Sequence, residues 1–139
     1  MKEGARDGIR LALNELAAME SVEVVILTSR DGLIASSSGD MGEEDELRAA
    51  MVAAVFGTVG RAVAPLNMGL PTDAIIETDS HCLQITSIDD FLLVTVTGKG
   101  ANVGLVRLGL RQTARRIQSL LLGNGERTEA AVAGDAAPA

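Results

Sequence analysis

The sequence predicts an α+β domain in which a five-stranded antiparallel sheet carries one long helix on one face and the two terminal helices on the other. Three observations lead to this prediction. Short β-branched runs alternate with polar turns, apolar residues recur at helical spacing near both ends, and one central stretch is apolar almost all round a helical wheel. The expected order is helix, strand, strand, helix, three strands and helix. A chain of 139 residues can bury the core of one such domain.

The first helix is expected from Gly4 to Met19, where apolar residues recur at the i, i+3, i+4, i+7 spacing. These residues are Ile9, Ala12, Leu13, Leu16 and Met19. A β-branched, aliphatic run follows from Val22 to Thr28, and Leu33 to Ser37 is expected to return as a second strand. The Asp31-Gly32 pair between them is a strong hairpin signal. The sequence therefore predicts an antiparallel pair of strands after the first helix.

The longest predicted helix runs from Glu43 to Leu66. Carboxylates in its first turn meet the positive end of the helix dipole, and Pro65 prevents the helix from continuing. At about 100° per residue, only Arg48, Thr58 and Arg61 interrupt its apolar surface. Small residues form a seam along one side of this helix. They are Ala49, Ala53, Gly57, Gly60 and Ala64.

A helix that is apolar nearly all round must also be covered nearly all round. The sheet covers one face, and the other face is covered either by the rest of a monomer core or by a second copy of the chain. The seam favours the second copy, because small residues let two helix backbones approach closely. Arg48 and Arg61 argue against a membrane span, because they interrupt the run of about 20 apolar residues that a span needs.

Three more strands are expected, Asp73 to Thr78, Cys82 to Ser87 and Phe91 to Thr97, and short polar turns join them into a meander. The last helix is expected from Val103 to Leu122. Its apolar stripe is Val106, Leu110, Thr113, Ile117, Leu120 and Leu121. Its outer face carries Arg107, Arg111, Arg115 and Arg116. This face is either a solvated surface or a docking face for an acidic partner. The remaining residues, 123–139, lack periodicity, so the sequence predicts one domain over 4–122 and a disordered tail.

Composition excludes several classes of function. The net charge of −7 gives no attraction to a phosphate backbone, and the 1% aromatic content gives little surface for stacking bases, so no nucleic acid partner is expected. The single cysteine, Cys82, cannot form an internal disulfide, which fits a reducing compartment. The N-terminus shows no apolar secretion signal. The expected location is the cytoplasm.

No motif in the chain supports catalysis, a cofactor or a metal. The segment Gly98 to Gly104 follows a strand and opens a helix, but its spacing is G-x-G-x-x-x-G, so a turn that needs positive φ is favoured over a phosphate-binding loop. His81 is the only histidine, so a zinc site would lack ligands and a catalytic serine would lack another candidate base. Cys82 is expected to be a small buried hydrophobe.

The chain resembles the roadblock family of dynein light-chain-like domains, and the resemblance extends from Ile9 to Leu121. The residues that carry it are the strand and turn Val24–Ala35, the helix start Glu46–Ala50, and Ala101–Arg107 at the entry to the last helix. The resemblance implies dimers in which the third strands pair into a continuous sheet and the long helices pack together. It also implies a non-enzymatic role. Bacterial and archaeal relatives are partners and regulators of small Ras-like GTPases, and eukaryotic ones are dynein light chains or lysosomal scaffolds.

These arguments give one leading hypothesis and two alternatives. The leading hypothesis is a homodimeric, non-enzymatic adaptor that binds a small Ras-like GTPase and changes its conformational equilibrium or its location. The first alternative is a ligand-sensing module of profilin-like or PAS-like topology, with a cavity of about 300 Å³ or more under the sheet. The second is a purely structural assembly subunit. A heterodimer with a relative also stays open.

The leading hypothesis assigns two sets of interaction residues. The dimer interface is expected at the seam of the long helix and at the third strand. Its residues are Ala49, Ala53, Gly57, Gly60, Ala64, Ala74 and Ile76. The GTPase is expected to contact the same helix at Arg48, Met51, Val55 and Arg61. Each of the two arginines either pairs with a carboxylate across the dimer or faces the GTPase.

Overall fold

The computed structural model describes residues 3–39 and 44–123. It confirms the predicted fold class and the predicted order of elements. The helices are α1 (Glu3–Ala17), α2 (Asp45–Val63), a short 3₁₀ turn (Ala64–Leu66) and α3 (Val103–Leu121). The strands are β1 (Val22–Ser29), β2 (Ile34–Gly39), β3 (Asp73–Glu77), β4 (His81–Ile88) and β5 (Phe91–Gly98). The predicted tail lies outside the described residues except for Gly123, as does the predicted start of the long helix at Glu43.

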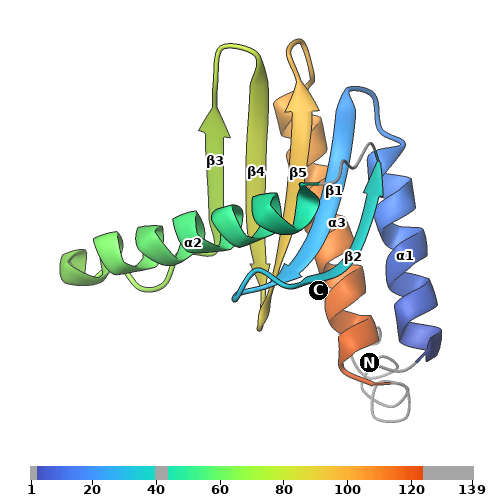
Figure 1. Ribbon diagram of the computed structural model, residues 1–139, viewed down its shortest axis with the longest axis horizontal. Coiled ribbons are helices and arrows are strands. Elements are labelled where there is room, and N and C mark those ends of the chain that lie inside the picture. The colour runs from blue at the N-terminus through green and yellow to red at the C-terminus, as the bar shows by residue number, and fades with distance from the viewer. Residues whose placement is uncertain (1–2, 40–43, 124–139) are drawn as a thin grey trace, which may run out of the picture.

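The five strands form one antiparallel sheet in the order β2-β1-β5-β4-β3 (Figure 1). The β1–β2 hairpin turns at the predicted Asp31-Gly32 pair, where Gly32 has φ +89°. A Cβ on Gly32 would lie 2.6 Å from the Ala50 Cα, so glycine also lets this hairpin contact α2. Strand β3 forms one edge of the sheet, and β2 forms the other.

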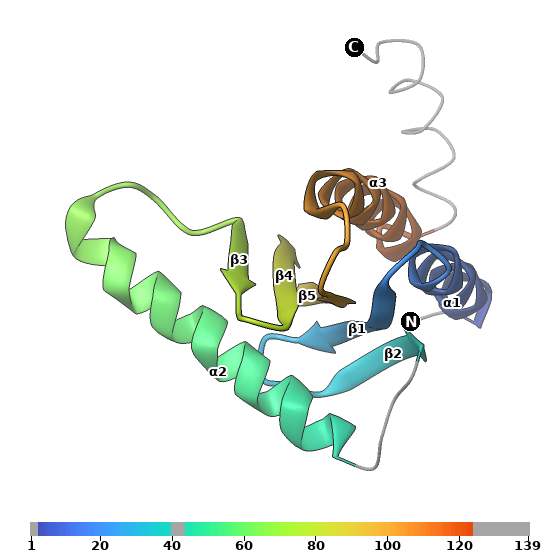
Figure 2. The same cartoon turned by 90° about the horizontal axis from the view of Figure 1, so that it is seen from above.

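Helices α1 and α3 lie side by side on one face of the sheet, and α2 lies on the opposite face (Figure 2). The α1 and α3 stripes predicted from periodicity are largely buried against alternate residues of β1 and β5. The fully packed members of this core are Ile9, Leu13, Leu16, Val25, Leu27, Leu93, Leu110 and Ile117. A Cβ on Gly109 would lie 2.7 Å from the Met19 sulfur, so this glycine allows α3 to close on α1.

Helix α2 covers the other face with only three buried side chains, Ala49, Ala53 and Phe56. They pack on the opposite set of alternate strand residues. These are Ile26, Ile85, Leu92 and Val94. The helix crosses the strands, continues beyond the β3 edge and ends at the predicted proline (Figures 1 and 2). About half of α2 therefore extends past the sheet that its first half covers.

This placement revises the seam prediction for Ala49 and Ala53. Both were expected to face a second copy, but they are 1% and 6% exposed and contact the chain's own sheet. The physical reason is steric. The large aliphatic side chains of the sheet allow a helix to approach closely only where the helix itself carries small side chains. Two glycines of the seam have more open surroundings. A Cβ on Gly60 would lie 3.9 Å from Pro71, and a Cβ on Gly57 would have only Arg61 within 4 Å.

Candidate functional site

The outer face of α2 carries a stripe of exposed apolar side chains. Leu47, Met51 and Val55 are 59%, 60% and 44% exposed and follow the i, i+4, i+8 spacing. They lie directly opposite the residues that α2 buries, because the helix turns about 100° per residue. A contiguous exposed apolar stripe of this kind marks a protein interaction site more often than an isolated apolar residue does. Met51 and Val55, predicted as partner-binding residues, are thus accessible.

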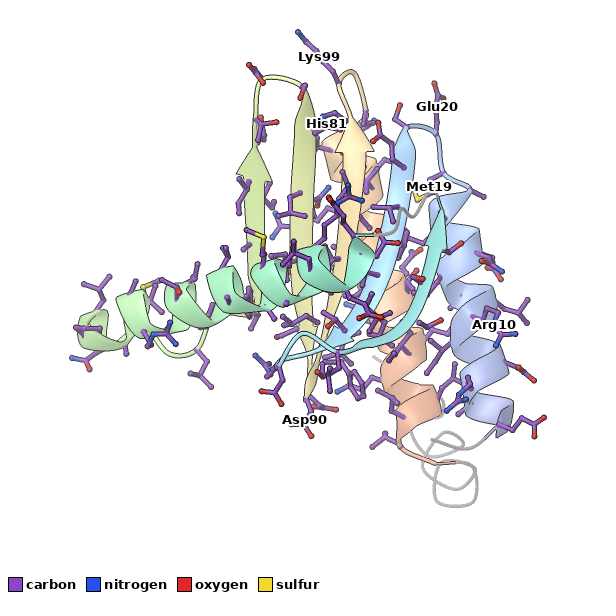
Figure 3. All side chains as sticks on the ribbon, viewed as in Figure 1. Arg10, Met19, Glu20, His81, Asp90 and Lys99 are labelled. Carbon is purple, nitrogen blue, oxygen red and sulfur yellow. The ribbon has the colours of Figure 1, made fainter. Side chains whose placement is uncertain are left out.

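One flank of α2 faces a part of the sheet that none of the described helices covers. Arg48 on this flank lines a surface pocket of about 370 Å³ together with Val24, Val96 and His81. Figure 3 shows His81 on the portion of the sheet that α2 leaves open. Further along, the same flank carries a row of half-buried valines at Val52, Val59 and Val63. The chain therefore has both an overhanging apolar helix flank and an uncovered apolar strip of sheet.

Strand β3 presents an open edge next to these two surfaces. The Thr78 N–H donates to the His81 carbonyl across the β3–β4 pair at 2.8 Å. Along an antiparallel edge strand, the N–H and C=O groups of successive residues point alternately toward the neighbouring strand and away from it. Because Thr78 points toward β4, the backbone groups of Asp73, Ile75 and Glu77 point away from β4. A row of outward N–H and C=O groups is a template for pairing with another strand.

The two predicted β3 interface residues lie on the α2 side of the sheet. Ala74 packs partly against the α2 core, and Ile76 is 38% exposed. Ile75, which points to the opposite face, is also exposed. A short edge strand with apolar side chains exposed on both faces is typical of an interaction edge.

The two arginines of α2 are engaged within their own helix. Arg48 forms ion pairs with Asp45 at 3.3 Å and with Glu44 at 3.9 Å. Arg61 donates to the Thr58 hydroxyl at 3.0 Å. Such exposed pairs contribute little stability, so both guanidinium groups remain able to exchange these contacts for a partner's carboxylate.

The structure brings together three polar groups that sequence reasoning missed. The Ser80 hydroxyl lies 2.8 Å from His81 Nδ1, and His81 Nε2 lies 3.2 Å from the Glu23 carboxylate. The Glu23 side chain reaches across β5 over Gly98, where a Cβ would come within 2.9 Å of it. The order of groups matches a serine–histidine–acid relay, but His81 and Glu23 are half exposed, which is not the water-excluded setting that such a relay uses. We interpret the set as a polar link across the strand ends.

Cys82 is buried as predicted, with 4% of its surface exposed. Burial raises the pKa of the Cys82 thiol, the charge of Glu77 raises it further, and the Thr97 side chain offsets part of this increase. A raised pKa leaves less thiolate at any given pH, and the thiolate is the nucleophile. We therefore expect the Cys82 thiol to be unreactive in the folded protein.

We expect iodoacetamide at neutral pH to alkylate Cys82 at least about tenfold more slowly in the native protein than in urea, because both burial and the raised pKa suppress the reactive thiolate. Mass spectrometry of timed samples measures both rates. The native rate should begin to rise at a higher pH than the rate in urea. Equal rates in the two conditions would show that this end of β4 is open to solvent.

The glycine-containing segment between β5 and α3 is a turn, as predicted. Gly100 has φ +91°, and Asn102 caps α3 by accepting a hydrogen bond from the Leu105 N–H at 3.0 Å. The Asn102 cap was not predicted, although an asparagine directly before an apolar periodic run is a recognisable signal. The strand before the turn pairs antiparallel with both neighbours, which is not the setting of a phosphate-binding loop.

The pockets on the described residues are surface features. Two of them have volumes of about 370 and 320 Å³, and none of the residues that line these two is buried. A sensor with a ligand under the sheet would need an enclosed cavity of similar size. Both core layers are instead filled by aliphatic side chains. Among the described residues, no group of three or more His, Cys, Asp or Glu is placed to hold a metal ion.

One described helix, Asp45–Leu66, is long and apolar enough to cross a membrane by length and composition, with a mean hydropathy of 1.6. This differs from the sequence interpretation, in which Arg48 and Arg61 interrupt the run. Only 17% of its most apolar window is buried within the chain. Most of α2 is therefore left uncovered by the part of the chain that the structure describes.

Comparison with known proteins agrees with the fold. A model of the Roadblock/LC7 domain family matches residues 8–97. An uncharacterized protein of Methanocaldococcus jannaschii is 28% identical over 108 residues, which cover 78% of this chain and 95% of that protein. MglB of Myxococcus xanthus superposes with a TM-score of 0.80 at 20% identity, covering 87% of this chain and 92% of that one. A Roadblock/LC7 domain from Streptomyces avermitilis gives a TM-score of 0.76 at 17% identity, with coverages of 82% and 98%.

Proposed function

This chain belongs to the Roadblock/LC7 domain family, and from that premise we propose that it is a homodimeric, non-enzymatic adaptor that binds and regulates a small Ras-like GTPase. The observation that carries the proposal is the incomplete cover of α2. Its first half packs on the sheet, while its outer face is apolar and exposed and one flank carries half-buried valines. A monomer with such a surface lacks a partner.

The overhang and the uncovered strip of sheet are suited to each other. A two-fold axis at the β3 edge would pair β3 with its copy through the outward backbone groups around Ile75. The same rotation would carry the overhanging half of each α2 across the uncovered part of the other sheet, beside Val24 and Val96. The valine flank at Val59 and Val63 would then be buried between the two α2 helices. A two-fold interface must be self-complementary, and these surfaces meet that requirement.

A second copy covers α2 better than a bilayer does. The buried side chains of α2, with Phe56 the largest, close the core over Ile26, Ile85 and Leu92. Moving α2 into a membrane would expose these residues to water and would place Arg48 and Arg61 in hydrocarbon. The helix cannot span a membrane while the described domain stays folded.

Dimerisation leaves the outer face of α2 for the GTPase. Leu47, Met51 and Val55 point away from the sheet, so the two copies of this stripe would lie side by side on one surface of the dimer. Arg48 and Arg61 would form its polar rim, where they can pair with carboxylates of the partner. A GTPase that binds across both copies would respond to the dimer rather than to the single chain. Such a partner places the adaptor in the cytoplasm.

The test is binding of the purified protein to the small Ras-like GTPases of its own host, each loaded with GDP or with a non-hydrolysable GTP analogue. We expect one of them to bind at micromolar concentration with a preference for one nucleotide. We expect Met51→Asp to weaken that binding by about tenfold or more, because a carboxylate at the centre of the contact would be desolvated. Leu11→Asp on α1, where Leu11 is 57% exposed, is the matched control.

Each alternative gives a different result in the same experiment. A structural subunit would associate with a partner regardless of the bound nucleotide. A ligand sensor would bind no GTPase and would gain thermal stability from a small molecule. The proposal would be abandoned if no host GTPase bound at micromolar concentration, or if Leu11→Asp weakened binding as much as Met51→Asp.

A further inference from the structure

Helix α3 concentrates positive charge in an acidic protein. The chain has a net charge of −7, yet α3 contains four arginines and no acidic residue. Arg116 is held by Glu15 of α1, with nitrogen–oxygen distances of 3.1 Å. The other three, Arg107, Arg111 and Arg115, lie one turn apart along the exposed side of α3. Their combined field favours an anionic partner.

Most of this charge is not neutralised within the described part of the chain. Arg111 reaches the Asp73 carboxylate at 3.5 Å, and that carboxylate also accepts a hydrogen bond from the Thr72 hydroxyl at 2.8 Å. Arg107 and Arg115 form no ion pair with any residue in 3–39 or 44–123. The contact with Asp73 fixes which way this side of α3 points. It faces the start of β3 and the end of β4.

A pocket lies at that position, between α3 and these strands. It has a volume of about 270 Å³ and is lined by two guanidinium groups, one carboxylate and several neutral polar groups. The polar lining residues are Arg111, Arg115, Asp73, Gln118, Thr72, Thr86 and Ser87. The Thr72 and Thr86 hydroxyls donate within the chain, so the two guanidinium groups are the main donors for a ligand. Ile88 and Ala114 supply apolar lining. The lining residues thus carry one positive charge in excess, which matches a single carboxylate in charge and in hydrogen-bonding chemistry.

The spacing of the arginines matches an extended chain. Residues four apart on a helix rise by about 6 Å. Alternate side chains of an extended segment point the same way at intervals of about 6.7 Å. Three carboxylates at alternate positions of an extended segment could therefore each meet one of Arg107, Arg111 and Arg115. Strand β3 leaves this side of α3 open, because no helix of the described residues covers β3 on this face of the sheet (Figure 2).

We propose that the side of α3 facing β3 and β4 is a docking site for an extended acidic segment of a partner protein, with carboxylates at alternate positions and one of them seated in the pocket on Arg115. This site goes beyond the proposed function, because it lies on the opposite face of the sheet from α2. An adaptor with both sites would hold a GTPase on one face and an acidic partner on the other.

The test uses two fluorescein-labelled peptides of the same composition, Glu-Ser-Glu-Ser-Glu and Glu-Glu-Glu-Ser-Ser, titrated with the full chain at low ionic strength. We expect the alternating peptide to bind more tightly in fluorescence anisotropy. We expect Arg115→Gln and Arg111→Gln each to weaken binding by roughly tenfold, since each removes a charge-assisted hydrogen bond. Arg10→Gln is the matched control. Arg10 is an exposed arginine on α1 (Figure 3), so this substitution removes the same charge far from the pocket.

Three results would overturn the proposal. The two peptides could bind equally, which would show non-specific attraction. Arg115→Gln could weaken binding no more than Arg10→Gln does. Vesicles containing phosphatidylserine, or inorganic phosphate, could bind at α3 while the peptide does not, which would assign the charge to a lipid surface or to a free anion. Circular dichroism of each variant controls for folding. None of these measurements depends on a GTPase, so this proposal and the GTPase proposal can fail independently.

Discussion

The native protein should have a solution mass of twice its 14.4 kDa chain, and the Val59→Asp variant should have the mass of one chain. Val59 is half-buried and lines a surface pocket with Val63, Met68 and Pro71, on the α2 flank that we place between the two helices of the dimer. A carboxylate buried there without a partner costs about 3 kcal/mol, and a two-fold interface contains it twice, so the dissociation constant should rise about ten-thousandfold. Light scattering across a dilution series measures the mass.

Gly57→Leu separates the two possible helix contacts. Gly57 belongs to the small seam predicted from the sequence, whereas the structure places it on the flank opposite the valines, near Arg61 only. If the seam is the contact, a leucine there must block association. If the valine flank is the contact, Gly57→Leu should remain dimeric, and its helix should be slightly stabilised because glycine is a poor helix former.

A third variant, Ile75→Pro, tests the strand pairing. Proline removes the outward N–H at the centre of β3 and leaves the backbone bonds to β4 in place, so the variant should fold and dimerise weakly. A monomeric native protein at all concentrations would contradict the whole arrangement. It would leave the overhang of α2 as a surface for a different protein.

The sequence predicted the fold well because the apolar residues of most elements follow a clear helical or strand period. In α1, the periodicity that includes Ile9, Leu13 and Leu16 leaves no choice about which side meets the sheet. In β5, alternation assigned Leu92 and Val94 to one face and Leu93 to the other, and the two core clusters divide in the same way. Strand alternation and the short polar turns then restrict the topology to a single antiparallel sheet.

The sequence could not show which side of α2 meets the sheet, because a helix that is apolar nearly all round has no single apolar face on the helical wheel. The side that meets the sheet is decided by Phe56 and by the closeness that Ala49 and Ala53 permit, which depends on the shape of the sheet. Contacts between distant segments were equally hidden. Nothing near Glu23 or Arg111 in the sequence indicates His81 or Asp73 as a partner.

Phe56→Ala should lower the free energy of unfolding by about 3 kcal/mol, the largest stability effect expected from a single substitution in α2. Phe56 is 2% exposed and is the only large side chain among the three that α2 buries. Its ring packs with the α2 core, and the Arg30 guanidinium lies over the ring, 6.0 Å from its centroid. Removing the ring leaves two buried alanines and the partly buried Val52 to hold a helix of 19 residues on the sheet.

Urea unfolding measures this loss, and the Val59→Asp background keeps dissociation of the dimer out of the measurement. With a slope typical of a small domain, the midpoint should fall by about 1 to 2 M. Val55→Ala is the control, because Val55 precedes Phe56, is 44% exposed and should change the free energy of unfolding by less than about 1 kcal/mol. If the two variants unfold alike, contacts other than Phe56 hold α2 on the sheet. If Phe56→Ala alone is destabilised, one aromatic side chain fixes the helix whose exposed surfaces we assign to dimerisation and to the GTPase.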